Sequence, residues 1–384
     1  MWYIVFSALF SLTSAAVFYA ELTKVESFRE RLVRAGEWEN YLREKEAHLQ
    51  KFDKSESQST LYDYEDSEYV INITIGTPPQ FFVVLPDIGS NIFWVVDKNC
   101  PNCEYPPPNG DRFDPSQSST CNETGKTYHI AYGDGSAGSS GDVAEDVLTI
   151  GDDQNFTVQN TAFGLASYFH NFVGASEIFH PFDGIFGLSP EQDANVSSPI
   201  FTMIEQNLLD QSIFTFYLQR RGHAEGVPAG RLTFGGIDEE NCGPVIGYAN
   251  FTLPSWYYSI LVDQVAYKDI VIKLETDNLA RIDSGNAWIF VPNEIFNKYI
   301  VDVNATTDGS YYYADCNATT DPVIFIIGGH EYEVESQQLI TDPENDTCRL
   351  YIGSGLGLGD PFMRSYCHVF DIGNERIDFA KPKA

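Results

Sequence analysis

Two Asp-x-Gly triplets, each set in an apolar run, constrain the fold of this chain more than any other feature. The first is Asp87-Ile88-Gly89 in VVLPDIGSNIFWV, and the second is Asp283-Ser284-Gly285 in ARIDSGNAWIFVP. A carboxylate that ends a hydrophobic strand is costly to bury unless it is paired or hydrogen-bonded. A glycine two residues later allows a sharp turn and a close approach of the backbone. One triplet in each half of the chain therefore predicts two similar lobes that each bring a carboxylate to a shared cleft.

Two carboxylates in one cleft have a defined chemistry. At a separation of about 3 Å they cannot both ionise easily, so they share a proton and titrate in two separate steps. One can then accept a proton from a water molecule while the other protonates a substrate carbonyl. Asp87 and Asp283 are accordingly the candidate catalytic residues.

The composition agrees with a large β-rich protein but does not identify a chemistry. The 384 residues are enough for two lobes, and 27 Phe and 22 Tyr occur in short apolar runs separated by turn-forming residues, a pattern typical of many strands. A secreted β-sandwich protein without catalysis would have much the same composition. The net charge of −32 makes nucleic acids and anionic membrane surfaces poor partners.

Beyond the triplets, the chain contains an ordered set of segments: IGTPPQFFVV, FDPSQSST, AYGDGSAGSSG, PFDGIFGLSP, RLTFGGID, YYSILVDQV and LGDPFMRSYCHVFDIGNERIDFA. Over roughly residues 62–384 this set resembles the pepsin-like aspartic proteases of peptidase family A1, most of all nematode-type or cathepsin D-like members. The resemblance implies an all-β dominated, bilobal pepsin-like acid protease fold, with two six-stranded β-barrel lobes, few short helices and a cleft between the lobes. The expected lobes are residues 62–245 and 246–384. One helix is expected in SPIFTMIEQNLLD, where Ile200, Ile204 and Leu208 recur at helical spacing.

The resemblance also implies roles for individual residues around the catalytic pair. Those expected to support the two carboxylates are Gly89, Ser90, Ser284 and Gly285. Those expected in the flap, a hairpin that covers the substrate, and in substrate binding are Tyr132, Gly133, Gly135, Ser136 and Trp94. The Tyr132 hydroxyl is expected to bond to Trp94, and the flap is expected to exclude water and to hold an extended peptide by main-chain contacts.

Four residues near the pair depart from the family pattern. Ile88 lies where the family has a Thr or Ser whose hydroxyl bonds to the opposite lobe, and Asn286 replaces a hydroxyl that would steady the second carboxylate. Pro86 removes a strand donor directly before the first carboxylate. Gly357 lies where a larger apolar residue usually packs behind the pair.

These observations leave three classes of function. The leading hypothesis is an aspartic endopeptidase that hydrolyses peptide bonds in proteins at acidic pH, without a covalent intermediate. The alternative, favoured by the four departures, is a catalytically weak or inactive pseudopeptidase that binds peptides or partner proteins in the same cleft. A structural or storage glycoprotein fits the acidity, but it leaves the cleft residues unexplained.

The N-terminal part of the chain predicts export and a zymogen. Residues 1–16 resemble a signal peptide, although a missing positive n-region leaves an uncleaved anchor open. Residues 17–60 resemble an activation propeptide with a helical pattern in ESFRERLVRAGEWENYLREKEAHLQKF, whose Lys45 and Lys51 are candidates to neutralise the carboxylates; a solvated helix is the other interpretation. Eight Asn-x-Ser/Thr sequons include Asn72, which is expected in a strand with poor accessibility. The expected location is extracellular, of the gut lumen type, or lysosomal, with a monomer as the default and no stable membrane anchor.

Seven cysteines fit an oxidising compartment with one left over. The family resemblance implies a Cys316–Cys348 disulfide, and Cys242–Cys367 is the second expected pair. Cys100 and Cys103 can pair in a short loop, next to Cys121. A zinc site at Cys100-x-x-Cys103 is the rival interpretation, but no His or second Cys pair stands nearby at zinc spacing. We expect no metal and no cofactor, and protein or peptide substrates as partners.

Overall fold

The computed structural model describes residues 17–25, 68–101, 112–132, 137–151, 156–170, 182–190, 195–220, 227–251, 257–274, 279–309, 311–344 and 347–383. Several sequence predictions therefore lie outside the described residues: the signal peptide, the propeptide after residue 25, Lys45, Lys51, Cys103, and the flap residues Gly133, Gly135 and Ser136. No helix in the described ranges is long and apolar enough to cross a membrane.

The first half of the chain closes into a six-stranded barrel. Its strands follow the order β2–β3–β8–β4–β7–β6, and β6 returns to pair with β2. Their bounds are Glu68–Ile75 (β2), Gln80–Asp87 (β3), Gly184–Gly187 (β8), Trp94–Val96 (β4), Phe156–His170 (β7) and Ala137–Ile150 (β6). A further strand, β5 (Asn122–Tyr132), pairs with β6 as an antiparallel hairpin. Closure leaves the interior lined by alternate side chains of each strand.

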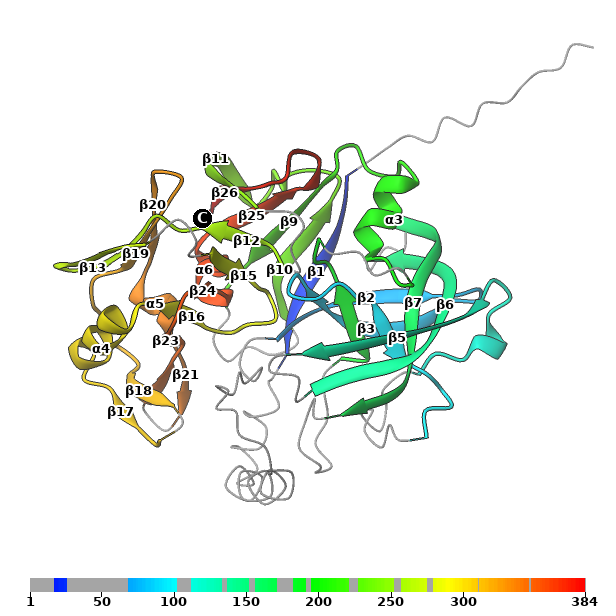
Figure 1. The fold of residues 1–384 in the computed structure, drawn as a ribbon, viewed down its shortest axis with the longest axis horizontal. Coiled ribbons are helices and arrows are strands. Elements are labelled where there is room, and N and C mark those ends of the chain that lie inside the picture. The colour runs from blue at the N-terminus through cyan, green and yellow to red at the C-terminus, as the bar shows by residue number, and fades with distance from the viewer. Residues whose placement is uncertain are drawn as a thin grey trace, which may run out of the picture.

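A run of six further strands extends this barrel sheet and joins the two ends of the chain. Its order is β11–β26–β25–β9–β10–β1, with β1 next to β2 (Figure 1). The bounds are Cys242–Asn250 (β11), Arg376–Pro382 (β26), Cys367–Asp371 (β25), Ile213–Leu218 (β9), Val227–Phe234 (β10) and Phe18–Val25 (β1). The beginning of the expected propeptide is thus a sheet strand, and the expected lobe boundary at residue 245 falls within β11.

The second half of the chain forms three smaller sheets, seen in yellow and orange in Figure 1. The five-stranded sheet has the order β12 (Ser259–Leu261), β15 (Leu279–Ile282), β24 (Gly357–Leu358), β16 (Ile289–Val291) and β23 (Ile352–Ser354). One four-stranded sheet has β14 (Ile270–Lys273), β13 (Gln264–Tyr267), β19 (Val323–Ile327) and β20 (His330–Val334). The other has β17 (Thr306–Thr307), β18 (Tyr312–Asp315), β22 (Thr347–Leu350) and β21 (Ile340–Glu344).

The helices of the described residues are short. They are α3 (Pro199–Glu205), α4 (Asn293–Asp302), α5 (Ser336–Leu339) and α6 (Asp360–Ser365), with 3-10 turns at Pro115–Gln117 and Ile372–Asn374. Helix α3 confirms the predicted helix, and it begins with Pro199, whose fixed φ suits the first helical turn. It ends earlier than the apolar spacing implied, because Asn207 adopts a left-handed φ of 54°.

The buried side chains confirm the strand pattern. All six residues of β9 are buried, and Phe214 stacks on Phe370 of β25 with ring centroids 4.6 Å apart. In β2, Ile71 and Ile73 point into the core while Asn72 between them is exposed, because successive side chains of a strand point to opposite faces. The expectation of poor accessibility at Asn72 is therefore wrong.

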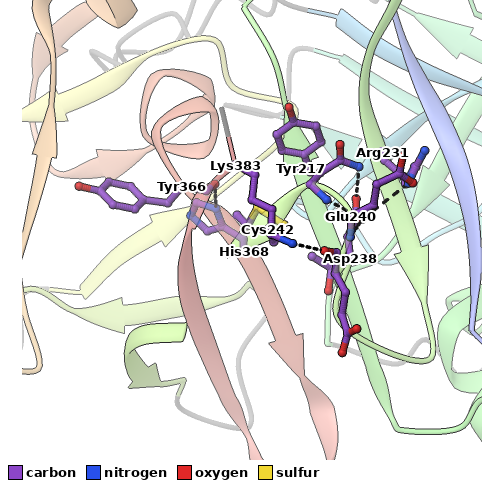
Figure 2. The surroundings of a disulfide bond; sticks show 12 residues. Tyr217, Arg231, Asp238, Glu240, Cys242, Tyr366, His368 and Lys383 are labelled. Atoms are coloured by element: carbon purple, nitrogen blue, oxygen red, sulfur yellow. Dashed lines mark hydrogen bonds and ion pairs between the residues drawn. A yellow bond between two sulfur atoms is a disulfide. The ribbon is translucent and has the colours of Figure 1, made fainter. Parts of the chain in front are cut away.

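Two disulfides stabilise the second half of the chain. Cys242 of β11 is bonded to Cys367 of β25 with a Cα–Cα distance of 6.0 Å, and Cys316 is bonded to Cys348 at 4.8 Å. Figure 2 shows the first bridge with its neighbours, among them Asp238, whose carbonyl accepts from the Cys242 amide at 2.8 Å. Cys100 is also disulfide-bonded, and Cys121 is a free thiol.

Candidate active site

The first triplet begins at the last residue of β3 and continues into the turn that follows this strand. Asp87 is the last residue of this strand, and the residue is only 6% exposed. Its Oδ1 accepts the Gly89 amide at 2.8 Å, and its Oδ2 accepts the Ser90 hydroxyl at 2.5 Å. The turn after the strand thus supplies two donors to a carboxylate that is otherwise removed from water.

The second triplet repeats this arrangement with one difference. Asp283 follows β15 and is also 6% exposed. Its Oδ1 accepts the Gly285 amide at 2.9 Å. Its Oδ2 lies 2.7 Å from a guanidinium nitrogen of Arg281, so an ion pair stands where Asp87 has a hydroxyl.

The two glycines bring both carboxylates to one point. A Cβ atom at Gly285 would lie 3.1 Å from Asp87 Oδ1 and 3.4 Å from Asp283 Oδ1. A Cβ atom at Gly89 would lie only 2.4 Å from Asp283 Oδ1, a distance that no real Cβ tolerates. The absence of a side chain at both positions is therefore what lets the turns of the two halves approach each other.

Ser284 ties the two turns together. Its hydroxyl donates to the Pro86 carbonyl at 2.9 Å and accepts the Ile88 amide at 3.1 Å. All of these atoms are buried, where a hydrogen bond cannot be exchanged for one with water. One hydroxyl of the second triplet therefore holds the backbone on both sides of Asp87.

The electrostatics of the pair favour one shared proton. Burial, and then the nearby negative charge of Asp283, raise the pKa of Asp87 from 3.8 to about 6, against the opposing effects of Ser90, Arg281 and the Gly89 amide. Like charges in one buried site cannot both remain ionised at low cost. At mildly acidic pH, Asp87 is thus the member that carries the proton.

Tyr132 and Trp94 extend the site toward the β5–β6 hairpin. Tyr132 is the last residue of β5 and pairs with Ala137 across the hairpin. Its buried hydroxyl accepts the Trp94 indole N–H at 2.8 Å. Burial, followed by the charge of Asp87, raises the pKa of Tyr132 well above its usual range, so the phenol stays neutral.

Comparison with known proteins identifies the family. The model of the eukaryotic aspartyl protease family matches residues 68–382. The chain belongs to this family. It is 33% identical to aspartic protease 1 of Caenorhabditis elegans, over 97% of this chain and 96% of that protein. It is 30% identical to aspartic protease 2 of Necator americanus, over 99% of each chain. It is also 30% identical to pepsin A of Gallus gallus, over 84% of this chain and 86% of that one.

Two departures from the aspartyl protease pattern have a structural explanation. Pro86 lies beyond the β2–β3 ladder, whose last pair on that side is Ile71 with Val84, although on its other side it is aligned with Phe186 of β8. Its carbonyl still accepts from Ser284. Gly357 leaves room for an aromatic ring, because a Cβ there would lie 3.1 Å from Phe290 Cδ2. The Phe290 ring of β16 thus packs directly against the backbone at Gly357.

The other two departures change the contacts of the pair. The Asn286 side chain accepts the Trp288 amide at 3.1 Å, so its oxygen serves the turn and not the carboxylate. Ile88 is fully buried and has no hydroxyl to reach across to the second turn.

Sequence reasoning missed Arg281. The signal was present in ARIDSGNAWIFVP, where an arginine interrupts an apolar strand two residues before Asp283. Side chains two apart on a strand share one face. Within the described ranges, no group of three or more His, Cys, Asp or Glu residues that could hold a metal ion was found.

Proposed function

We propose that this chain is an aspartic endopeptidase that hydrolyses peptide bonds with a water molecule activated between Asp87 and Asp283. The observation that carries the proposal is the convergence of two buried carboxylates on one point beside Gly285. Family membership supports the same activity.

The two carboxylates divide the proton transfers between them. Asp283, ion-paired with Arg281, accepts a proton from the water as its oxygen attacks the peptide carbonyl carbon. Asp87 donates its proton to the carbonyl oxygen, which gives a neutral tetrahedral diol. Collapse of the diol passes a proton to the leaving amine and returns the pair to its singly protonated state. The protein forms no bond to the substrate, and general acid–base catalysis of this kind operates through positioned protons alone.

The β5–β6 hairpin and the two Asp-Gly turns position the substrate. Tyr132, held by Trp94, stands at the turn end of the β5–β6 hairpin, next to Ser90 and Asp87. We infer that the β5–β6 hairpin closes over an extended peptide as the family's flap does, and that Gly133, Gly135 and Ser136 take part in substrate binding. Main-chain bonding of an extended segment makes such recognition tolerant of substrate sequence.

We further propose that the enzyme is made as a zymogen in the secretory pathway and is delivered outside the cell or to lysosomes. Disulfides support an oxidising compartment. Residues 1–16 would be the signal peptide and residues 17–60 the activation segment. Within that segment, Glu21 of β1 is 2.7 Å from Arg231 of β10, and this ion pair attaches the segment to the sheet.

Cleavage of a mixed peptide library between about pH 3 and 7 tests the proposal, with the processed wild-type protein beside Asp87→Asn and Asp283→Asn. We expect the wild type to cleave and both variants to lose at least about a hundredfold in rate, in line with the loss of a general acid or base. Wild-type activity should fall above about pH 6, where Asp87 loses its proton. A folded, processed wild type that binds peptides without cleaving them would overturn the proposal and indicate the pseudopeptidase.

A further inference from the structure

Arg281 contacts both Asp-Gly turns at once. It lies on β15 on the same face as Asp283, and one guanidinium nitrogen is 2.7 Å from Asp283 Oδ2. The same nitrogen donates to the Gly89 carbonyl at 3.0 Å. The guanidinium is held in place by the Tyr257 ring, with its central carbon 3.6 Å from the ring centroid.

The cation takes the place of a hydroxyl beside the second carboxylate. In the first turn, the Gly89 amide donates a hydrogen bond to one oxygen of Asp87, and the Ser90 hydroxyl donates to the other. In the second turn, the Gly285 amide serves the equivalent oxygen of Asp283. Asn286, the counterpart of Ser90, is directed to Trp288 instead. Arg281 supplies the donor to the second oxygen and adds a positive charge.

Arg281 also makes a further hydrogen bond between the two halves, which Ile88 cannot make because it has no hydroxyl. Ser284 donates a hydrogen bond from the second turn to the first, and a hydroxyl at position 88 would be needed to reciprocate it. Ile88 has none. The bond from Arg281 to the Gly89 carbonyl gives the first turn a second attachment to the opposite half. Arg281 therefore offsets two departures from the family pattern with one guanidinium.

We propose that Arg281 is a positioning residue that makes the carboxylate pair asymmetric: it places a positive charge against Asp283 and fixes its turn against Gly89, which leaves Asp87 as the proton carrier. This inference rests on the proposed function for its catalytic consequence. The arrangement of charges itself does not depend on turnover. An opposite charge in contact with a carboxylate favours the ionised form.

The groups that face the pair set the direction of the effect. Asp87 is faced by Asp283 from β15, by Arg281 from the same strand, and by Ser90 and Tyr132 from its own half. Asp283 adds negative charge, Tyr132 stays neutral, and Arg281 is the positive charge among them. Removing the guanidinium takes a positive charge away from the pair, which therefore binds protons more readily. Both limbs of the pH–rate profile should move to higher pH.

Arg281→Met, Arg281→Lys and a matched control, Arg376→Met, test the proposal. Arg376 is similarly exposed, at 36% against 34%, and is paired with Asp378 at 2.8 Å, but it belongs to β26 and touches neither turn. Each variant is measured by its pH–rate profile with kcat and KM separated, and by the pH dependence of urea unfolding. The second measurement needs no catalysis, so it remains decisive if the peptidase activity itself is absent.

We expect Arg281→Met to shift both limbs of the profile upward by about one pH unit, the low end of the effect of an adjacent opposite charge. The pH midpoint of the stability curve should move in the same direction. Arg281→Lys should keep the midpoints near those of the wild type while lowering kcat, because an ammonium keeps the charge but lacks the planar fork. Arg376→Met should leave both limbs of the pH–rate profile unchanged, because its partners Asp371 and Asp378 lie outside the pair. Identical midpoints in Arg281→Met and the wild type would overturn the proposal, as would an equal shift of the pH–rate profile in Arg376→Met.

Discussion

Asp87 and Asp283 carry the same side chain in nearly equivalent turns, yet their partners give them different tasks. Asp87 is bonded to a neutral hydroxyl and has its pKa raised by burial, whereas Asp283 is bonded to a cation. These different partners determine which carboxyl group of the pair holds the shared proton. The difference resides in single residues, Ser90 on one side and Arg281 on the other.

The raised pKa of Asp87 predicts that the site destabilises the protein at neutral pH. Below about pH 4 the folded and unfolded states both hold the proton. Between pH 4 and 6 the unfolded state loses it while folded Asp87 keeps it, so stability falls as pH rises, by at most about 3 kcal/mol for a shift from 3.8 to about 6. Asp87→Asn stays neutral and should be about 1–3 kcal/mol more stable than the wild type at pH 7, with little gain at pH 4.

Urea unfolding at the two pH values measures this difference. The matched control is Asp142→Asn, an exposed aspartate on β6 outside the site. Its effect should be within about 0.5 kcal/mol at either pH, as is usual for surface changes. A gain in Asp87→Asn that is the same at pH 4 and pH 7 would show that burial does not hold the proton on this carboxyl.

At the scale of elements, the two halves share a repeat that the sequence conceals. β3 pairs in parallel with β8, β8 is antiparallel to β4, and β4 is parallel to β7. In the second half, β15, β24, β16 and β23 repeat the parallel, antiparallel, parallel order. Each Asp-bearing strand thus begins the same four-stranded unit. The sequence shows this repeat only in the two triplets. The equivalent strands β8 and β24 have only four and two residues, which is too short for a recognisable pattern.

The two disulfides should stabilise their elements unequally. The Cys242–Cys367 bridge closes 125 residues and ties β11 to β25, while Cys316–Cys348 closes 32. In the chain-entropy account, each costs about 2–5 kcal/mol to remove, and the longer loop costs about 1 kcal/mol more. Thermal and urea unfolding of the two double Cys→Ala variants measures this order. A larger loss for the 316–348 pair would contradict loop length as the deciding factor.

Some elements could be read from the sequence and others could not. The helix at Pro199 and the strands before each Asp follow from local pattern, because apolar period and turn residues act over a few positions. The place of β1 between β10 and β2 could not be read, since pairing with strands about 50 and 210 residues away depends on the whole sheet. The packing of Phe290 over Gly357 likewise depends on a neighbouring strand.

At the scale of the whole molecule, hydrogen bonds join the halves of the chain at the site. Ser284 makes two buried ones, and Arg281 makes a third that is partly buried. The family resemblance anticipated the serine contact, since a hydroxyl at that position was expected to cross between lobes. The arginine contact could not be inferred from the family pattern, because it compensates for what this chain lacks.

Ser284→Ala should loosen the junction between the halves. Its removal leaves the Ile88 amide and the Pro86 carbonyl without this buried partner, at a cost of about 1–3 kcal/mol in the free energy of unfolding. The peptidase rate should fall as well, because the Asp87 turn is then less well fixed. Ser284→Thr keeps the hydroxyl and serves as the control. Equal stability of the Ala and Thr variants would show that the bonds across the junction contribute little.

The most direct test of the whole account is the titration of Asp87 itself, followed by its carboxyl ¹³C signal in the wild type and in Asp283→Asn. The account predicts a midpoint near pH 6 in the wild type and a lower midpoint in the variant, because the negative charge of Asp283 is then gone. A wild-type midpoint near 3.8 that does not move in Asp283→Asn would mean that the two carboxylates do not act as a pair.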